Sequence, residues 1–369
     1  MDRAGLAAVD APLPARRLRL RAALADIRSH LTRSALKLAG DLAVAYLVLK
    51  LIPALKQALQ SLEHVSWQWL LGALALEVLS ELGFVVAWNQ IIDPQQVLAA
   101  DGGGRRMDDH VAWAQLGGGL LLPGGSWGGV GVGALILHRF GMPNKAIAER
   151  EFNLSFLNTA IDALVLVAFG LGLAAGILPG EKSLLLTLLP AAVAAAGIAL
   201  ALALSRRASR RAERLRDKHP KLASALVTLA RAVEDTRELL LHRGGWRSVL
   251  GTLAYLGFDV LVLWIAFLAV NTHPLPGFAV VTMAYIIGAL GGSIPLPAGA
   301  GTVGGIAGML IVYGVDHNSA IAAVVLHQAI GLLVPLTGGA IGYAIVHRRL
   351  ASIAGDAADE ASAASATDA

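Results

Sequence analysis

The sequence contains no cysteine and has few charged or aromatic residues. Without cysteine the chain forms no disulfide framework, carries no thiolate metal site and has no cysteine nucleophile. Only 15% of the 369 residues are charged and 5% are aromatic, whereas 56% are hydrophobic. That balance does not suit a soluble domain of this length. The composition therefore predicts an integral membrane protein.

Recognisable metal-binding patterns are also missing. The histidines and carboxylates show no zinc-ligand spacing, and the glycine-rich stretches lack the lysine of a phosphate-binding loop. We therefore expect no metal and no cofactor. The arrangement of the membrane segments is therefore the main indication of function.

Long apolar runs recur along most of the chain, each near the roughly 20 residues that a helix needs to cross a bilayer. We predict six full transmembrane helices, at residues 42–60, 67–92, 152–178, 183–204, 248–270 and 319–347. Two other apolar stretches, 111–137 and 277–313, are interrupted by proline and glycine. We predict that they form re-entrant broken-helix hairpins. The predicted fold class is an all-α integral membrane protein.

The two interruptions are similar to each other. One reads L-P-G-G-S-W-G-G-V-G-V-G around Pro123, and the other reads L-P-A-G-A-G-T-V-G-G-I-A-G around Pro297. The prolines lie 174 residues apart (297 − 123 = 174), and the closing glycines, Gly141 and Gly314, lie 173 apart (314 − 141 = 173). A corresponding pair of Gly/Pro-interrupted segments indicates a transporter-like binding site at the interface of two repeats.

Basic residues are concentrated in three segments that flank membrane helices: 1–40, 205–247 and 347–349. Because short basic flanks stay in the cytoplasm, we predict that both termini are cytoplasmic. The first hairpin then enters from the cytoplasmic side and the second from the external side, so that the two halves form an inverted repeat. The first repeat covers residues 41–178, and the second consists of 183–204 and 248–349.

The basic segment 205–247 also carries apolar residues at helical spacing. This pattern predicts a cytoplasmic amphipathic helix on the anionic leaflet of the membrane. Nucleic-acid binding is a poorer interpretation, because the same cluster sets the membrane orientation. The arm 1–40 is predicted to be partly disordered, and the small, acidic tail 350–369 to be disordered.

Three carboxylates in the predicted membrane helices are candidates for ion coupling. Glu77 and Glu81 share one helix face because they are four residues apart, and Asp259 lies in another crossing. A charge at the bilayer centre costs about 2.5–3.5 kcal/mol on insertion scales. We interpret the three as a proton or cation site facing a substrate cavity. The alternative is a structural role, with the glutamates protonated or paired with Lys50 or Lys56.

The helix breaks themselves are candidates for substrate binding. They free several backbone amides, and the helix N-termini that follow present positive dipole ends to an anion such as a phosphodiester headgroup. A purely structural turn is the alternative. The candidate residues at the breaks are Pro123, Gly124, Gly125, Trp127, Pro297, Gly299 and Gly301.

The second break and the helix after it resemble a known family. The segments I-P-L-P-A-G-A-G-T-V-G-G-I-A-G and V-V-L-H-Q-A-I-G-L-L-V-P-L-T-G-G are similar to the C-terminal signature of the lysylphosphatidylglycerol synthase transmembrane family. This flippase-like family includes the flippase half of the multiple peptide resistance factor. The resemblance implies a bacterial plasma-membrane protein that moves or binds a lipid-linked substrate. Relatives often carry a cytoplasmic synthetase domain, which this sequence lacks after residue 350, so we expect no lipid-aminoacylating enzyme.

Several ionisable positions of the family are neutral in this chain. A family glutamate after the second break corresponds to Gly304, and the arginine of the last helix corresponds to Gln328. The family's aspartate in the helix after the first hairpin is kept as Asp162. The resemblance therefore implies substrate-binding roles for Asp162 and Gln328. It also implies a different headgroup, or a member that no longer transports.

These observations predict a protein that translocates a lipid or lipid-linked intermediate across the bacterial inner membrane. One alternative is a non-transporting membrane scaffold that binds lipid and a cell-envelope enzyme. A second alternative is a proton-coupled small-solute transporter. The expected partners are membrane lipid, an envelope-biosynthesis enzyme or a second copy of the chain, and no nucleic acid.

Overall fold

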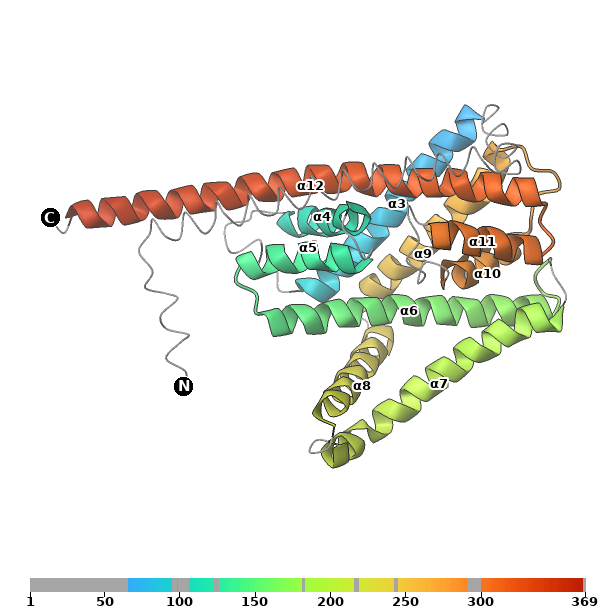
Figure 1. Cartoon of the computed structure of the whole chain (residues 1–369), viewed down its shortest axis with the longest axis horizontal. Coiled ribbons are helices and arrows are strands. Elements are labelled where there is room, and N and C mark those ends of the chain that lie inside the picture. Colours follow the sequence, from blue (N-terminus) through green and yellow to red (C-terminus); the bar gives the residue numbers. More distant parts are fainter. Residues whose placement is uncertain are drawn as a thin grey trace.

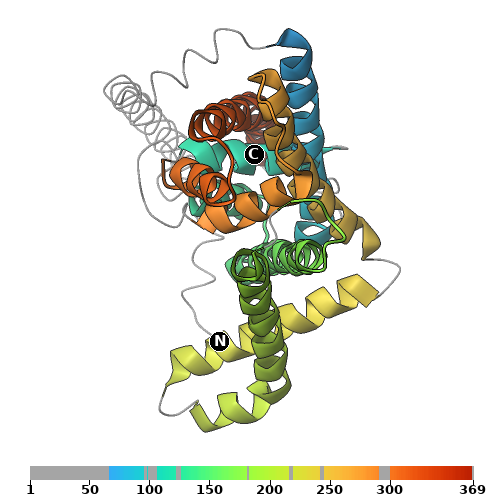
Figure 2. The same cartoon turned by 90° about the vertical axis from the view of Figure 1, so that its right-hand side faces the viewer.

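The computed structural model of the chain describes residues 66–94, 98, 106–121, 126–180, 183–215, 219–241, 245–290 and 300–367. In this part of the chain all regular structure is helical, which confirms the predicted all-α class (Figures 1 and 2). The helices are α3 (Trp67–Ile92), α4 (Met107–Leu121), α5 (Ser126–Arg139), α6 (Asn144–Ala174), α7 (Leu184–Leu215), α8 (Pro220–Leu241), α9 (Trp246–Ala269), α10 (Phe278–Ala289), α11 (Ala300–Val312) and α12 (His317–Thr367).

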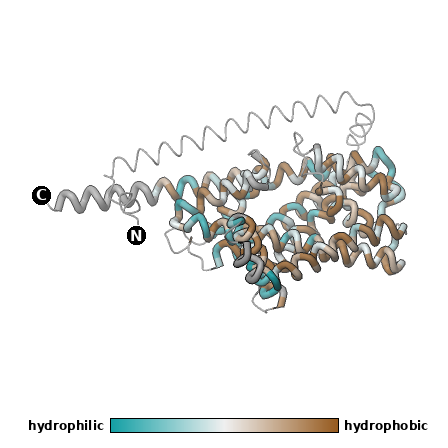
Figure 3. The backbone as a smooth tube through the Cα atoms, turned by 60° about the horizontal axis from the view of Figure 1, so that its bottom comes forward, coloured by the Kyte–Doolittle hydropathy of each residue, from teal (hydrophilic) through white to brown (hydrophobic). Residues whose placement is uncertain are grey.

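Five of the described helices are long and apolar enough to cross a membrane. They are α3, α6, α9, the Leu184–Ala208 part of α7 and the His317–Ser352 part of α12. Long hydrophobic stretches colour these helices brown in Figure 3. The chain is therefore a multi-pass membrane protein. The crossing predicted at 42–60 and the arm 1–40 lie outside the described residues.

Some helices are longer than the predicted crossings because they continue past their apolar runs. Helix α3 has the predicted bounds, whereas α6 begins at Asn144, well before residue 152. Helix α12 continues to Thr367, so the prediction of a disordered tail from residue 350 is wrong up to that point. Hydropathy marks the part of a helix that suits lipid. It carries no information on an alanine-rich extension, which has high helix propensity of its own.

Two pairs of short helices lie in the two stretches that were predicted to form hairpins. Helices α4 and α5 form one pair, and α10 and α11 form the other. The longest of the four has 15 residues, which at 1.5 Å per residue reaches about 22 Å, less than the roughly 30 Å of a hydrocarbon core. In Figure 1 one pair lies between α6 and α12 at one end of the body, and the other pair lies between them at the opposite end.

Helices α3 and α9 cross at two glycines. A Cβ atom on Gly83 would lie 2.7 Å from the backbone oxygen of Gly251 and 2.7 Å from the nitrogen of Tyr255. A Cβ atom on Gly251 would lie 2.7 Å from the oxygen of Gly83 and 2.9 Å from the nitrogen of Ala87. The contact is reciprocal, and only glycine at both positions allows backbones to approach so closely in a membrane.

Helix α12 also packs on α4 through a close contact between glycines. A Cβ atom on Gly117 would lie 2.8 Å from the Cα of Gly339, and Gly338 faces the ring of Trp113. Pro335 lies within α12 one turn earlier, and its carbonyl oxygen also faces Gly117. These small residues fix the first short pair against the last helix.

The basic segment 205–247 forms two helical parts instead of the single helix that was predicted. Its first part continues α7 to Leu215, and its second part is α8, which turns back and projects with α7 from the body in Figure 2. Helix α8 is joined to α6 by an ion pair between Arg231 and Glu149 at 3.3 Å. The Asn153 amide also donates to Asp235 over 2.7 Å. One face of α8 is therefore held by protein.

A buried acid–histidine cluster as the candidate functional site

Asp259 on α9 is bonded on both of its carboxylate oxygens. The Nε2 atom of His327, on α12, lies 2.6 Å from Oδ1. The hydroxyl of Tyr285, on α10, donates to Oδ2. The Tyr285 and His327 rings meet edge to face with centroids 5.8 Å apart. Three helices thus converge on one carboxylate inside the membrane body.

Three more carboxyl groups surround Asp259. Glu77 and Glu81 on α3 are only 3% and 4% exposed, and both interact electrostatically with Asp259. Asp162 on α6 interacts with Asp259 as well. The Oε2 atoms of both glutamates are buried and have no hydrogen-bond partner among the described residues. We call Glu77, Glu81, Asp162, Asp259 and His327 the central cluster.

The charge of the central cluster decides which ligands it suits. It holds four carboxyl groups and one histidine, so a phosphate placed among them would be repelled. Crowded carboxylates in a low-dielectric interior must be neutralised by protons or by a cation. No group of three or more histidine and carboxylate ligands in the described part of the chain is arranged for a metal ion. The carboxyl groups of the cluster are therefore suited to binding protons or a cation.

The sequence predicted the carboxyl groups of this cluster but not their uncharged partners. The structure brings together Glu77, Glu81 and Asp259, which were predicted for ion coupling, and Asp162, which was predicted at the substrate. Their roles stay predictions. His327 and Tyr285 were missed as site residues. A single histidine or tyrosine in an apolar run gives no signal by itself, because either is common as a satisfied core residue.

The other predicted substrate residues are only partly described. Trp127 and Gly301 lie in the first turns of α5 and α11, as expected of helix N-termini after the breaks. Gln328 follows His327 directly on α12, and a rotation of about 100° per residue turns it toward a different side of the helix. The remaining candidates, Pro123, Gly124, Gly125, Pro297 and Gly299, lie outside the described residues. Their role stays a prediction.

A second buried chain of hydrogen bonds lies beside the first short pair. The indole Nε1 of Trp88, on α3, donates to Gln115 Oε1 over 2.8 Å. Gln115, on α4, donates through Nε2 to Glu151 Oε2, on α6, over 3.0 Å. Glu151 is 6% exposed, and its Oε1 has no partner among the described residues. We call Trp88, Gln115 and Glu151 the first-half triad.

The first-half triad has a counterpart in Asp259, Tyr285 and His327, which we call the second-half triad. The two breaks are related by 174 residues at their prolines and by 173 at their closing glycines. Adding 174 to the position of Gln115 gives 289, one helical turn from Tyr285. Adding 173 to the position of Glu151 gives 324, one turn from His327. The reciprocal glycines of α3 and α9 give a shift of 168 (251 − 83 = 168), which places Trp88 at 256, one turn from Asp259. Each triad therefore joins helices that hold matching places in the two predicted repeats.

Two carboxyl groups outside the spanning helices have shifted pKa values. Burial, with help from Asp93 and Asp109, raises the pKa of Asp108 at the start of α4 to about 6. Between about pH 4 and pH 6 the folded chain therefore keeps a proton on Asp108 that the unfolded chain releases. As the pH rises through this range, the free energy of unfolding falls. Hydrogen bonds from Ser319 lower the pKa of Asp316, which caps α12.

Removing Gln115 should destabilise the first half of the protein. Gln115→Leu leaves the Trp88 indole and the Glu151 carboxyl without their buried partner. Each unsatisfied group costs about 1–3 kcal/mol, so we expect a clear fall in the free energy of unfolding, measured by titration of detergent micelles with SDS. Asn153→Leu, which removes an exposed hydrogen bond to Asp235, is the control and should change stability much less. Equal stability of the two variants would contradict the importance of the triad.

The fold and the central cluster define a multi-pass membrane protein with a titratable site inside the bilayer. A family model described as lysylphosphatidylglycerol synthase TM region matches residues 35–339. The chain belongs to this family, as its second break predicted. No curated protein matches the sequence.

Proposed function

We propose that this protein translocates a lipid or lipid-linked intermediate across the bacterial plasma membrane, and that it acts as a transporter and not as an enzyme. The observation that carries the proposal is the central cluster, where carboxyl groups from three helices meet at a histidine inside the membrane body. Ionisable groups in such positions mark ion pathways and proton relays. Membership of the family supports a lipid as the transported molecule.

We further propose that the chain is built as an inverted repeat. The proposed topology has six full crossings, two re-entrant hairpins that enter the membrane from opposite sides, and both termini in the cytoplasm. The placement of the short pairs at opposite ends between α6 and α12 supports this arrangement (Figure 1). The correspondence of the two triads supports it as well. Repeats of this kind supply two related conformations that open the same site to either side in turn.

The two kinds of candidate site divide the work in this mechanism. The N-termini of α5 and α11 present backbone amides and positive dipole ends, which suit the phosphate of a headgroup. The central cluster binds protons or a cation, and His327 exchanges a proton with Asp259 over their short contact. Binding of protons or a cation neutralises the charge of the central cluster. The free energy needed to move the two repeats against each other is thereby lowered. Lipid movement is thereby coupled to an ion gradient.

Lipid translocation can be tested with the full chain in proteoliposomes. Fluorescent lipids with anionic, zwitterionic and cationic headgroups are followed across the bilayer with and without a pH gradient. We expect movement above that of protein-free liposomes, for at least one headgroup, and a rate that depends on the gradient. Glu77→Gln combined with Glu81→Gln should remove that dependence. Glu149→Gln, which neutralises a carboxylate outside the cluster, should leave it intact.

The same assay distinguishes the alternatives. Absence of lipid movement under every gradient would reject translocation and favour a scaffold for an envelope enzyme. Proton flux that depends on a water-soluble solute, without lipid movement, would assign the central cluster to small-solute transport. Lipid movement that the double variant leaves unchanged would remove Glu77 and Glu81 from the mechanism.

A further inference from the structure

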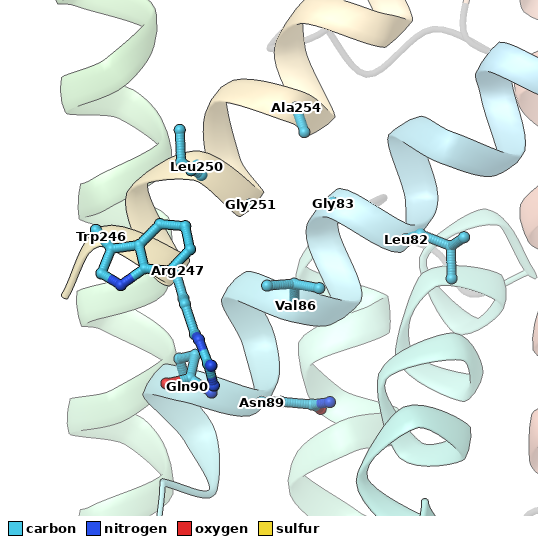
Figure 4. Close-up of a pocket in the computed structure, with 10 residues that line it drawn as sticks. All are labelled: Leu82, Gly83, Val86, Asn89, Gln90, Trp246, Arg247, Leu250, Gly251 and Ala254. Carbon is cyan, nitrogen blue, oxygen red and sulfur yellow. The ribbon is translucent and has the colours of Figure 1, made fainter. Parts of the chain in front are cut away.

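A groove lies on the outside of the α3–α9 crossing, away from the central cluster. It has a volume of about 540 Å³. Ten residues of the two helices line it, among them Gly83, Val86, Gln90, Trp246, Arg247 and Gly251. Figure 4 labels them on the two helices. Gly83 and Gly251, where the two helices are in contact, lie among its lining residues.

One end of the groove is polar and the other is apolar. Arg247 extends from α9 toward Gln90 of α3, and Trp246 lies beside it at the same end (Figure 4). The Arg247 guanidinium stacks on the Trp246 ring at 5.9 Å. Leu82 and Ala254 lie toward the other end, and from Arg247 to Ala254 the α9 axis rises by about 10 Å. A Trp–Arg pair at the start of a spanning helix is typical of the membrane–water interface.

Arg247 is available to a ligand. It is exposed, and no carboxylate in the described part of the chain forms an ion pair with it. Asn89, also at the polar end, already donates its amide to Asp109 over 2.7 Å, so Arg247 and Gln90 supply the remaining donors. A guanidinium binds phosphate through two parallel hydrogen bonds. The polar end is therefore complementary to one phosphate group.

We propose that this groove binds a single anionic phospholipid from the leaflet in which Arg247 lies. Its phosphate contacts Arg247, its headgroup contacts Gln90, and the upper part of one acyl chain lies between Val86 and Leu250. The charge of Arg247 selects an anionic over a zwitterionic headgroup. The basic segment before α9 places this leaflet on the cytoplasmic side. Lipid binding in this groove does not depend on transport, so it can be tested independently of the proposed function.

Native mass spectrometry of the full chain in detergent can test the groove. Phosphatidylglycerol and phosphatidylcholine with identical acyl chains are offered in turn, and glycerol phosphate serves as a probe without acyl chains. We expect one phosphatidylglycerol to bind about tenfold more tightly than phosphatidylcholine, as one charge-assisted contact provides, and glycerol phosphate not to bind. Arg247→Gln should remove the preference, whereas Arg237→Gln on α8, also exposed, should keep it.

A second variant tests the apolar end without touching the charge. Val86 is 43% exposed on the wall of the groove. Because Val86→Trp fills the space, we expect it to abolish binding of both phosphatidylglycerol and phosphatidylcholine. Leu71→Trp, at an exposed position nearer the other end of α3, is the matched control. Equal binding of both lipids by the unchanged protein, an unchanged preference in Arg247→Gln, or a second copy of the chain covering α3 and α9 would each overturn the proposal.

Discussion

Asp259→Asn should abolish the response of lipid movement to a pH gradient. Asparagine preserves the size of the side chain and can still bond to Tyr285, but it neither carries a charge nor exchanges a proton with His327. A positioned proton-transfer group commonly contributes a factor of about 10² to 10⁴. We therefore expect gradient-driven movement to fall at least about a hundredfold. Fluorescent-lipid movement in proteoliposomes, measured over a range of pH, provides the readout.

A partner variant separates the ionic role of Asp259 from a packing role. His327→Gln removes the other titratable group of the pair while keeping a hydrogen-bonding side chain on α12. Both variants should lose the pH dependence and retain the helical content and melting behaviour of the unchanged protein. Glu149→Gln, outside the cluster, should keep both. A folded Asp259→Asn protein that responds to the gradient like the unchanged protein would rule out this aspartate as the coupling group.

Gly251→Val should unfold the α3–α9 crossing. The added Cβ would lie 2.7 Å from the carbonyl oxygen of Gly83 and 2.9 Å from the nitrogen of Ala87, which are backbone atoms and have no rotamer to change. Overpacking of this kind costs about 1–3 kcal/mol in ordinary cores and more where backbone must move. We expect about 3 kcal/mol or more of lost stability, together with a poor yield of folded protein. SDS titration of the purified chain measures the loss.

Gly257→Val is the matched control on the same helix. Gly257 lies within α9, but a Cβ there meets no atom within 4 Å. The substitution therefore adds the same side chain without a clash, and stability should change by about 0.5 kcal/mol or less. If Gly251→Val and Gly257→Val were equally stable, the close glycine contact could not be what holds the two helices together.

The fold was predictable from the sequence where hydrophobicity alone decides the structure. The bounds of α3 were predicted because its apolar run and its helix coincide. Helices α6 and α12 extend beyond the crossings that hydropathy predicted, and such extensions depend on helix propensity, which hydropathy does not report. The turn of α8 back onto α6 depends on specific contacts, such as Arg231 with Glu149, that no periodicity reveals.

The candidate site was predictable to the extent that burial of charge is costly. Glu77, Glu81 and Asp259 stand out in an apolar sequence because a carboxylate in lipid demands a reason. Tyr285 and Gln115 do not stand out, since an uncharged polar residue in an apolar sequence is common as a hydrogen-bonded core residue. Their importance follows only from the partners that the fold brings to them.

Helix α12 contains 51 residues, so it is about 77 Å long, more than twice the thickness of the hydrocarbon layer. The glycine contact at Gly339 holds it on α4, and from there to Thr367 it extends a further 42 Å or so. A rigid rod pivoting at such a point acts as a lever. A tilt of a few degrees at Gly339 would therefore move the Thr367 end by several ångströms.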